Sequence, residues 1–129
     1  MFTVAVDTKT PATAVSARKI PQWDYTAVYE TVIAVSTLKA FWKSSSQHRD
    51  AEGPTLAWYR DVLKAAWSKP SDVKQQFGNA SILQDGRVVF NIAGNKYRIV
   101  VWINYPHKVV HIRFIGTHEQ YDKIDAQTI

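Results

Sequence analysis

Residues 87–122, RVVFNIAGNKYRIVVWINYPHKVVHIRFIGTHEQYD, carry the pattern that decides the fold of this chain. Three apolar runs of strand length are separated by Gly94-Asn95 and by residues 105–108, and turns favour the residue types of both separators. The pattern predicts three antiparallel strands joined as a meander.

The same stretch has an unusual charge pattern, because no carboxylate lies between Asp85 and Glu119. The cations of this stretch are Arg87, Lys96, Arg98, Lys108 and Arg113. A sheet surface that carries only cations attracts polyanions such as nucleic acid.

Alternation of side chains along a strand predicts which residues share a face of the sheet. In the middle strand, an apolar face would be formed by Tyr97, Ile99, Val101 and Ile103. The opposite face would be formed by Lys96, Arg98, Val100 and Trp102. In the last strand the apolar face would continue with Val110, Ile112 and Phe114, and the other face would hold His111 and Arg113. Arg98 and Arg113 are therefore expected together on one cationic side.

The last strand is followed by a helix signal. Thr117 is followed three residues later by Gln120, which fits the capping-box pattern. The pattern predicts a short C-terminal helix that begins at His118, beside the cationic side of the sheet.

The preceding residues predict the other half of an α+β domain. Apolar residues recur at helical spacing in residues 36–48 and 55–67, and residues 72–77 can form a third short helix. A short apolar run at residues 31–35 predicts an N-terminal strand. The expected fold is that strand and two to three helices packed on an antiparallel three-stranded meander, with a short C-terminal helix.

The chain is expected to divide at residue 30. Residues 1–30 contain three cations and three anions, so the whole net charge of +5 lies in residues 31–129. Residues 1 to about 22 show neither helical nor strand periodicity. Residues 1–30 are therefore expected to be a flexible extension of a domain formed by residues 31–129. A translation start near Val28 or Val32 is an alternative explanation for this segment.

Composition excludes several classes of function. The chain has no cysteine, which rules out disulfides and thiolate metal sites and suits the cytoplasm. No apolar run approaches the roughly 20 residues of a membrane span. The four histidines have no metal-site spacing, and no phosphate-binding glycine loop or serine nucleophile elbow is present, so no metal or cofactor is expected.

The chemistry that remains is proton transfer beside cations. Cleavage of RNA without a metal needs a base for the 2′-hydroxyl, an acid for the leaving 5′-oxygen and cations for the charged phosphorane. His118, Tyr121 and Arg98 are of the residue types that can supply these groups.

Two parts of the sequence, RVVFNIAGNKYRIVVWINY and HIRFIGTHEQYDKID, resemble HigB-type toxins of bacterial toxin–antitoxin pairs, in the RelE/ParE superfamily. The similarity extends from about residue 31 to the C-terminus and includes AWYRDVLKAAWSKPSDVK at residues 57–74. It implies a compact RelE-like toxin that cleaves mRNA on the ribosome and leaves a cyclic phosphate. It also implies an oligomeric complex with a helix-turn-helix antitoxin of the HigA type.

The resemblance assigns expected roles to individual residues. Arg98 matches the phosphate-stabilising arginine, His118 matches the general acid, and Tyr121 with Asp122 matches the closing motif of the family. The expected RNA or phosphate contacts are Lys96, Arg113, Arg87 and Asn95.

Two other functions stay open at this stage. A ParE-like relative would inhibit gyrase without cutting nucleic acid, and a non-catalytic RNA-binding module would use the sheet as a stacking platform. The second needs exposed aromatic side chains on the cationic side, where only Trp102 qualifies. Both alternatives predict that His118 is dispensable.

Overall fold

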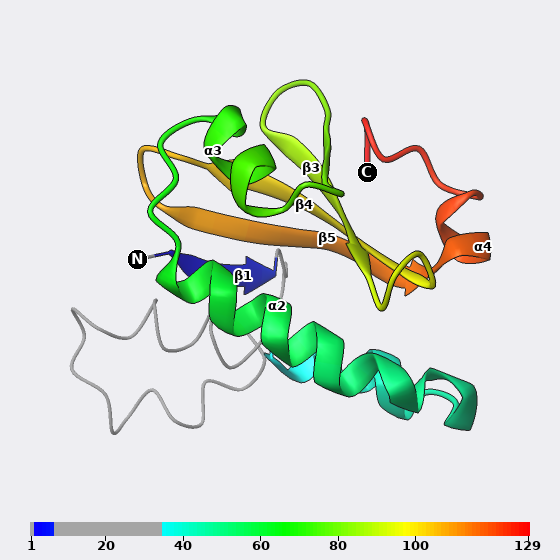
Figure 1. The fold of residues 1–129 in the computed structure, drawn as a ribbon. Helices are drawn as coiled ribbons and strands as arrows, with labels where there is room; N and C mark the ends of the chain where they lie inside the picture. The colour runs from blue at the N-terminus through cyan, green and yellow to red at the C-terminus, as the bar shows by residue number, and fades with distance from the viewer. Residues whose placement is uncertain (1, 7–34) are drawn as a thin grey trace, which may run out of the picture.

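A mixed five-stranded sheet with helices on one face forms the domain (Figure 1). The computed structural model describes residues 2–6 and 35–129. Residues 35–43 are helical. The other elements are β1 (Thr3–Val6), the 3-10 helix η2 (Ser46–Ala51), α2 (Glu52–Lys64), α3 (Pro70–Gln76), β2 (Ser81–Ile82), β3 (Arg87–Ile92), β4 (Tyr97–Asn104), β5 (Val109–Thr117) and α4 (His118–Tyr121).

The strand order is β1-β5-β4-β3-β2, so the sheet is larger than the expected meander. The antiparallel β3–β4 and β4–β5 pairs are present, as the turn signals predict. However, β1 adds a parallel strand beside β5, and the two-residue β2 adds a further antiparallel strand beside β3. The prediction of a purely antiparallel three-stranded sheet is therefore wrong, while the α+β class is right.

The N-terminal strand lies elsewhere in the sequence than expected. Residues 3–6 pair with residues 109–112 of β5, and Phe2, Val4 and Ala5 are buried. For these residues the prediction of a flexible extension is wrong. Val35 lies in a helix, so the strand expected at residues 31–35 is wrong at that position, and residues 7–34 lie outside the described part of the chain.

A β-bulge in β5 changes which side chains share a face. Val100 pairs with Phe114 but Val101 pairs with Ile112, so Arg113 is an extra residue between the two pairs. Because alternation restarts after the extra residue, Phe114 lies opposite the helix-covered face. The prediction that Phe114 continues the apolar face of Ile112 is therefore wrong.

The main core lies between the helices and one face of the sheet. In Figure 1, α2 runs along β1 and α3 lies near β3. Side chains of both helices share one buried cluster with Val4, Phe90 and Ile99. Aromatic rings fill much of this space, with Trp58 and Phe77 each packed edge-to-face on Phe90. The aromatic side chains of α2 thus belong to the core.

The other face of the sheet is partly covered by the C-terminal segment, residues 122–129. Ala126 is buried against Val89 and Val100, which are themselves almost completely buried. Gln127 exchanges two hydrogen bonds with the backbone of Gln84, and the segment returns from α4 toward β3 (Figure 1). The cationic face is therefore divided by a small apolar cluster.

The turn before β3 requires a glycine. Asp85 and Gly86 have positive φ values of 56° and 81°, and a Cβ atom at Gly86 would lie 2.9 Å from the carbonyl oxygen of Ile103. An Asp-Gly pair is of the residue types that turns favour, and the chain turns at this pair into β3. In the described residues, no helix is long and apolar enough to cross a membrane.

Burial of β1 predicts that residues 2–6 contribute to folding. Val4→Ala should lower the free energy of unfolding by about 2 kcal/mol, because it removes two fully buried methyl groups and leaves a cavity. Urea denaturation of the full chain measures this change. The matched control is Ile82→Ala on the other edge strand, where the side chain is 38% exposed and the loss should be about 0.5 kcal/mol or less. Equal losses for the two variants would contradict the role of β1.

Candidate active site

The start of α4 is fixed to the end of the β4–β5 ladder. The Thr117 hydroxyl accepts a hydrogen bond from the backbone N–H of Gln120, and the Gln120 side chain accepts one from the backbone N–H of Thr117, which confirms the expected capping box. The backbone N–H of His118 donates to the carbonyl of Lys96 at 3.1 Å. These bonds place His118 at the end of the sheet, next to the β3–β4 turn.

His118 is held by a carboxylate of its own helix. Its Nδ1 atom lies 3.2 Å from Oδ2 of Asp122, four residues later, and about half of the imidazole side chain is exposed. Because Nδ1 faces Asp122, the Nε2 atom is left for a ligand. Asp122 thus positions the histidine, a contact that the sequence pattern Thr-His-x-x-Tyr-Asp makes possible.

Arg98 lies on the sheet face opposite the helices and stacks on Tyr121. Its guanidinium carbon is 4.9 Å from the centre of the Tyr121 ring, which is within cation–π range. Its Nη2 atom donates to Oδ1 of Asn95 at 2.9 Å. Asn95 therefore orients Arg98 through its amide oxygen, and a phosphate contact of Asn95 stays a prediction.

Most of the donors of Arg98 are unused. A guanidinium has five N–H groups, and within the described residues one of them forms a hydrogen bond. Asn91 lies directly opposite Arg98 in the β3–β4 register, and its Oδ1 atom is buried without a partner in the same part of the chain. This end of the sheet therefore has donor capacity at Arg98 that the described residues do not use.

Lys96 lies on a different side from the one its position in the sequence predicts. It is an ion-pair partner of Asp50 in η2, and its ammonium group lies 5.5 Å from the centre of the Tyr97 ring. Asp50 belongs to η2, which packs on the helix-covered side of the sheet. The expectation that Lys96 shares a side with Arg98 is therefore wrong. The physical reason is that Lys96 belongs to the β3–β4 turn, where strand alternation no longer applies.

Asp50 also accepts a hydrogen bond from the Tyr97 hydroxyl, which lies within reach of the Gln47 carbonyl too, at 3.1 Å. The hydrogen bond from Lys96, and then that from Tyr97, holds the pKa of Asp50 below its usual value of 3.8. The same bond raises the pKa of Lys96 above 10.5, and burial followed by the Asp50 hydrogen bond raises the pKa of Tyr97 above 10.0. The cluster keeps both Lys96 and Tyr97 protonated, so neither is a ready base.

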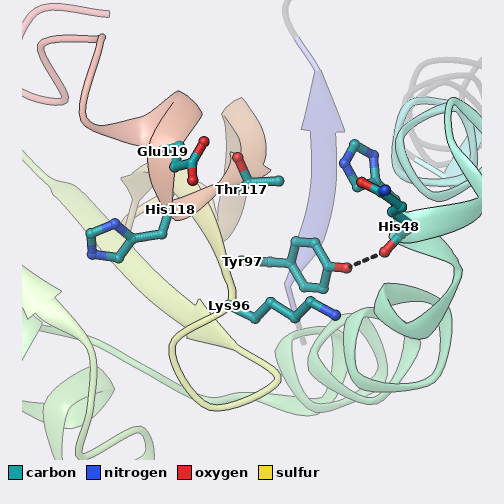
Figure 2. A pocket seen from close by; sticks show the side chains of 7 residues that line it. His48, Lys96, Tyr97, Thr117, His118 and Glu119 are labelled. Atoms are coloured by element: carbon teal, nitrogen blue, oxygen red, sulfur yellow. Dashed lines mark hydrogen bonds between the residues drawn. The ribbon is translucent and has the colours of Figure 1, made fainter.

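A cavity of about 630 Å³ lies between η2 and α4. It is lined by Gln47, His48, Lys96, Tyr97, Thr117, His118 and Glu119. In Figure 2 the His118 ring points away from His48 and Tyr97, on the other side of the α4 start. The His118 imidazole is thus turned away from the residues on the helix side of this cavity.

The other two expected cations lie farther along the sheet. Arg87 and Arg113 line a second cavity of about 300 Å³ together with Asp85, Trp102 and Gln127. Arg113 shares the face of Arg98, as expected, but the bulge places it toward Trp102. The structure therefore brings Arg98, Tyr121 and Asn95 into contact, with His118 at the start of the helix that holds Tyr121, and leaves Arg87 and Arg113 farther along the sheet.

Acidic and histidine side chains do not gather elsewhere in the described residues. Within residues 2–6 and 35–129, no group of three or more such side chains has the arrangement needed to hold a metal ion. We call Arg98, Tyr121, His118 and Asp122 the Arg98 cluster.

Comparison with known proteins identifies the family. A family model described as HigB_toxin, the RelE-like toxic component of a toxin-antitoxin system, matches residues 51–124, which is more than half of the chain. The chain belongs to this HigB toxin family. The match begins at the end of η2 and ends after α4, so it contains the whole Arg98 cluster and excludes β1.

Curated relatives agree with this assignment. The mRNA interferase toxin HigB of Escherichia coli strain K12 is 26% identical over 92 residues, which cover 70% of this chain and 88% of the relative. Proteins named mRNA interferase HigB from Escherichia coli O157:H7 and Shigella flexneri match with the same identity and coverage. The HigB resemblance noted in the sequence is therefore confirmed.

Sequence reasoning missed the partners that set the geometry of the site. Asp50 and Gln47 contact Tyr97 from a segment nearly fifty residues away, and no local pattern indicates this. Asn91 was overlooked although strand pairing could have placed it opposite Arg98, once the register was known. His118 and Asp122, by contrast, are four residues apart, and this spacing signals contact on a helix.

The ion pair of Lys96 and Asp50 predicts a pH-dependent contribution to stability. The depressed pKa of Asp50 adds stability above about pH 3.8 that is lost as the pH falls through that pKa. The raised pKa of Lys96 adds stability below about pH 10.5 that is lost as the pH rises through it. The difference in unfolding free energy between the native chain and Asp50→Asn should therefore be largest between these limits and shrink outside them.

Urea denaturation at a series of pH values measures this difference. Asp61→Asn, at an exposed position on α2, is the matched control and should show no such profile. A difference for Asp50→Asn that stays constant from pH 3 to pH 11 would contradict the electrostatic account.

Proposed function

We propose that this HigB-family toxin is an endoribonuclease that cuts mRNA on the ribosome, with the Arg98 cluster as its active site. The observation that carries the proposal is the stacking of Arg98 on Tyr121, which lies three residues after His118 in the same short helix. The name of the relatives, mRNA interferase, supports RNA as the substrate.

In this proposal Arg98 binds the scissile phosphate. Its one hydrogen bond to Asn95 and its stacking on Tyr121 fix the guanidinium plane, while the N–H groups of Nη1 make no hydrogen bond to a described residue and can bind phosphate oxygens. A guanidinium held in place before the substrate arrives stabilises the negative charge that develops on the phosphorane.

The proposed reaction forms a bond from the 2′-oxygen to phosphorus and breaks the bond from phosphorus to the 5′-oxygen. Tyr121, as its phenolate, takes the proton of the 2′-hydroxyl, and the protonated imidazole of His118 gives its Nε2 proton to the leaving 5′-oxygen. The products are a 2′,3′-cyclic phosphate and a free 5′-hydroxyl, so atoms and charge balance with no metal. Asp122 holds the His118 ring through Nδ1 during this transfer.

The proposal includes the partners of the toxin. The family description names a toxin–antitoxin system, so an antitoxin is expected, and we propose a helix-turn-helix protein of the HigA type in an oligomeric complex. The ribosome, which presents single-stranded mRNA, places the activity in the cytoplasm. The gyrase and RNA-binding alternatives are less favoured because the relatives are named as interferases.

Replacement of Arg98 tests the phosphate assignment. Arg98→Ala should lower the single-turnover rate of mRNA cleavage on programmed ribosomes by about 10²–10³, as the loss of one transition-state contact does elsewhere. Arg98→Lys should also be impaired, because an ammonium cannot form the two-pronged contact of a guanidinium. Arg60→Ala removes the same charge from an exposed position on α2 and should cleave normally. Full activity of Arg98→Ala would refute the assignment.

Replacement of His118 tests proton transfer. His118→Gln should reduce the cleavage rate by about 10²–10⁴, the usual contribution of a positioned general acid, with an unchanged fold and unchanged ribosome binding. Single-turnover cleavage of mRNA on programmed ribosomes measures the rates of the native chain and the variant. His107→Gln, in the exposed turn between β4 and β5, is the matched control. A His118→Gln variant that cleaves at the native rate would show that another group is the general acid.

Mapping of mRNA 5′ ends after induction in bacteria tests the function as a whole. Cuts should appear in translated messages and be absent when the same messages are not translated. Growth arrest without any new 5′ ends would instead favour gyrase as the target.

A further inference from the structure

The second cavity on the cationic face has no task in the proposed reaction. Arg87, Trp102 and Arg113 line it, together with Asp85 and Gln127, and its volume is about 300 Å³. Trp102 lies four residues beyond Arg98 along β4, a separation of about 13 Å at the usual rise of a strand. Ala126 covers Val89 and Val100 between the two places, so the cavity is separate from the Arg98 cluster.

Arg87 has unused binding capacity. Within residues 2–6 and 35–129 its guanidinium makes no hydrogen bond, and no carboxylate oxygen lies within 4 Å of it. Its Nη1 atom is buried without a partner in this part of the chain. A buried charged donor without a partner is unfavourable, because it has lost its hydrogen bonds to water. An anion at this cavity would restore them.

Trp102 provides a flat apolar surface beside this cation. Its ring is half-buried and lies on the His111 ring, with the ring centres 4.9 Å apart. By contrast, Trp42, Trp58 and Trp67 are each only 3% exposed and belong to the core. An indole backed by a second ring and next to guanidinium groups is the arrangement that proteins use to stack unpaired bases.

We propose that the Arg87–Trp102–Arg113 cavity binds one unpaired nucleotide, with the base stacked on Trp102 and a phosphate held by Arg87 and Arg113. This inference rests on the proposed action on RNA and adds a contact to a nucleotide other than the one that is cut. An unpaired nucleotide is favoured over a duplex because paired bases do not expose their faces for stacking. The nucleotide belongs either to the mRNA beyond the cleaved bond or to ribosomal RNA.

The first test is binding of short oligoribonucleotides whose 2′-oxygens are methylated, so that they cannot be cleaved. In fluorescence-polarisation titrations, Trp102→Ala should weaken binding about 10- to 100-fold, whereas Trp102→Phe should keep most of the affinity. Arg87→Gln should reduce the slope of log affinity against log salt concentration by about 0.7, the value for one phosphate contact to a single strand. Arg60→Gln carries the same charge change on the other side of the molecule and should leave the slope unchanged.

The second test identifies the source of the nucleotide. Single-turnover cleavage is measured on ribosomes programmed with mRNAs that are shortened stepwise on either side of the cut. If the mRNA supplies the nucleotide, the native chain and Trp102→Ala should become equal once that nucleotide is removed. If ribosomal RNA supplies it, Trp102→Ala should be slower at every length. Both results support a nucleotide site.

Three results would overturn the inference. Equal affinity losses in Arg87→Gln and Arg60→Gln would indicate unspecific charge attraction. An unchanged oligonucleotide affinity of Trp102→Ala would show that no base stacks on Trp102. Loss of antitoxin binding by these variants with unchanged oligonucleotide affinity would make the cavity a protein-docking site. In each case the native chain still cuts translated mRNA, whereas failure of the proposed function would abolish that cleavage in the native chain. Thermal unfolding verifies that each variant is folded, and Trp102→Phe serves as the second variant if Trp102→Ala is not.

Discussion

The pairing of β5 on both of its edges is the constraint on which the rest of the structure depends. β5 bonds to β1 in parallel and to β4 in antiparallel register, so it joins the N-terminus of the chain to the meander. The bulge at Arg113 then turns Phe114 to the face opposite the helices. That change produces the apolar cluster on which the C-terminal segment and Tyr121 rest, and Tyr121 in turn supports Arg98. The geometry of the Arg98 cluster thus follows from one extra residue in a strand.

Electrostatics divide the cations of the meander into groups with different environments. Lys96 is paired with Asp50, Arg98 is held by Asn95 and Tyr121, and Arg87 has no hydrogen bond or ion pair within the described residues. A count of charges in the sequence does not distinguish the environments of these three cations. Because paired cations have less capacity for a polyanion than unpaired ones, the attraction of RNA is expected to centre on Arg98 and Arg87.

Membership of the HigB toxin family and the geometry of the Arg98 cluster both support cleavage of RNA. The family match covers residues 51–124 and therefore contains Arg98, His118 and Tyr121. The fold shows why Arg98 and Tyr121 meet, since α4 follows directly on β5, and the capping box of α4 fixes His118 at the end of that strand. Residues 2–6 lie outside the match but complete the sheet that supports the site.

The sequence by itself determined the α+β class, the β3–β4–β5 meander, the Asp85-Gly86 turn, the start of α4 and the HigB resemblance. All of these depend on local patterns, because turns, caps and alternation are set by residues a few positions apart. The parallel pairing of β1, the bulge, the Asp50 contact with Lys96 and Tyr97, and the C-terminal cover over Val89 and Val100 came only from the tertiary structure. These features join segments far apart in the chain, and a one-residue shift in register reverses every face assignment beyond it. For that reason the residues of the candidate site could be named from the sequence, while their grouping into an Arg98 cluster and a separate Arg87–Trp102–Arg113 cavity could not.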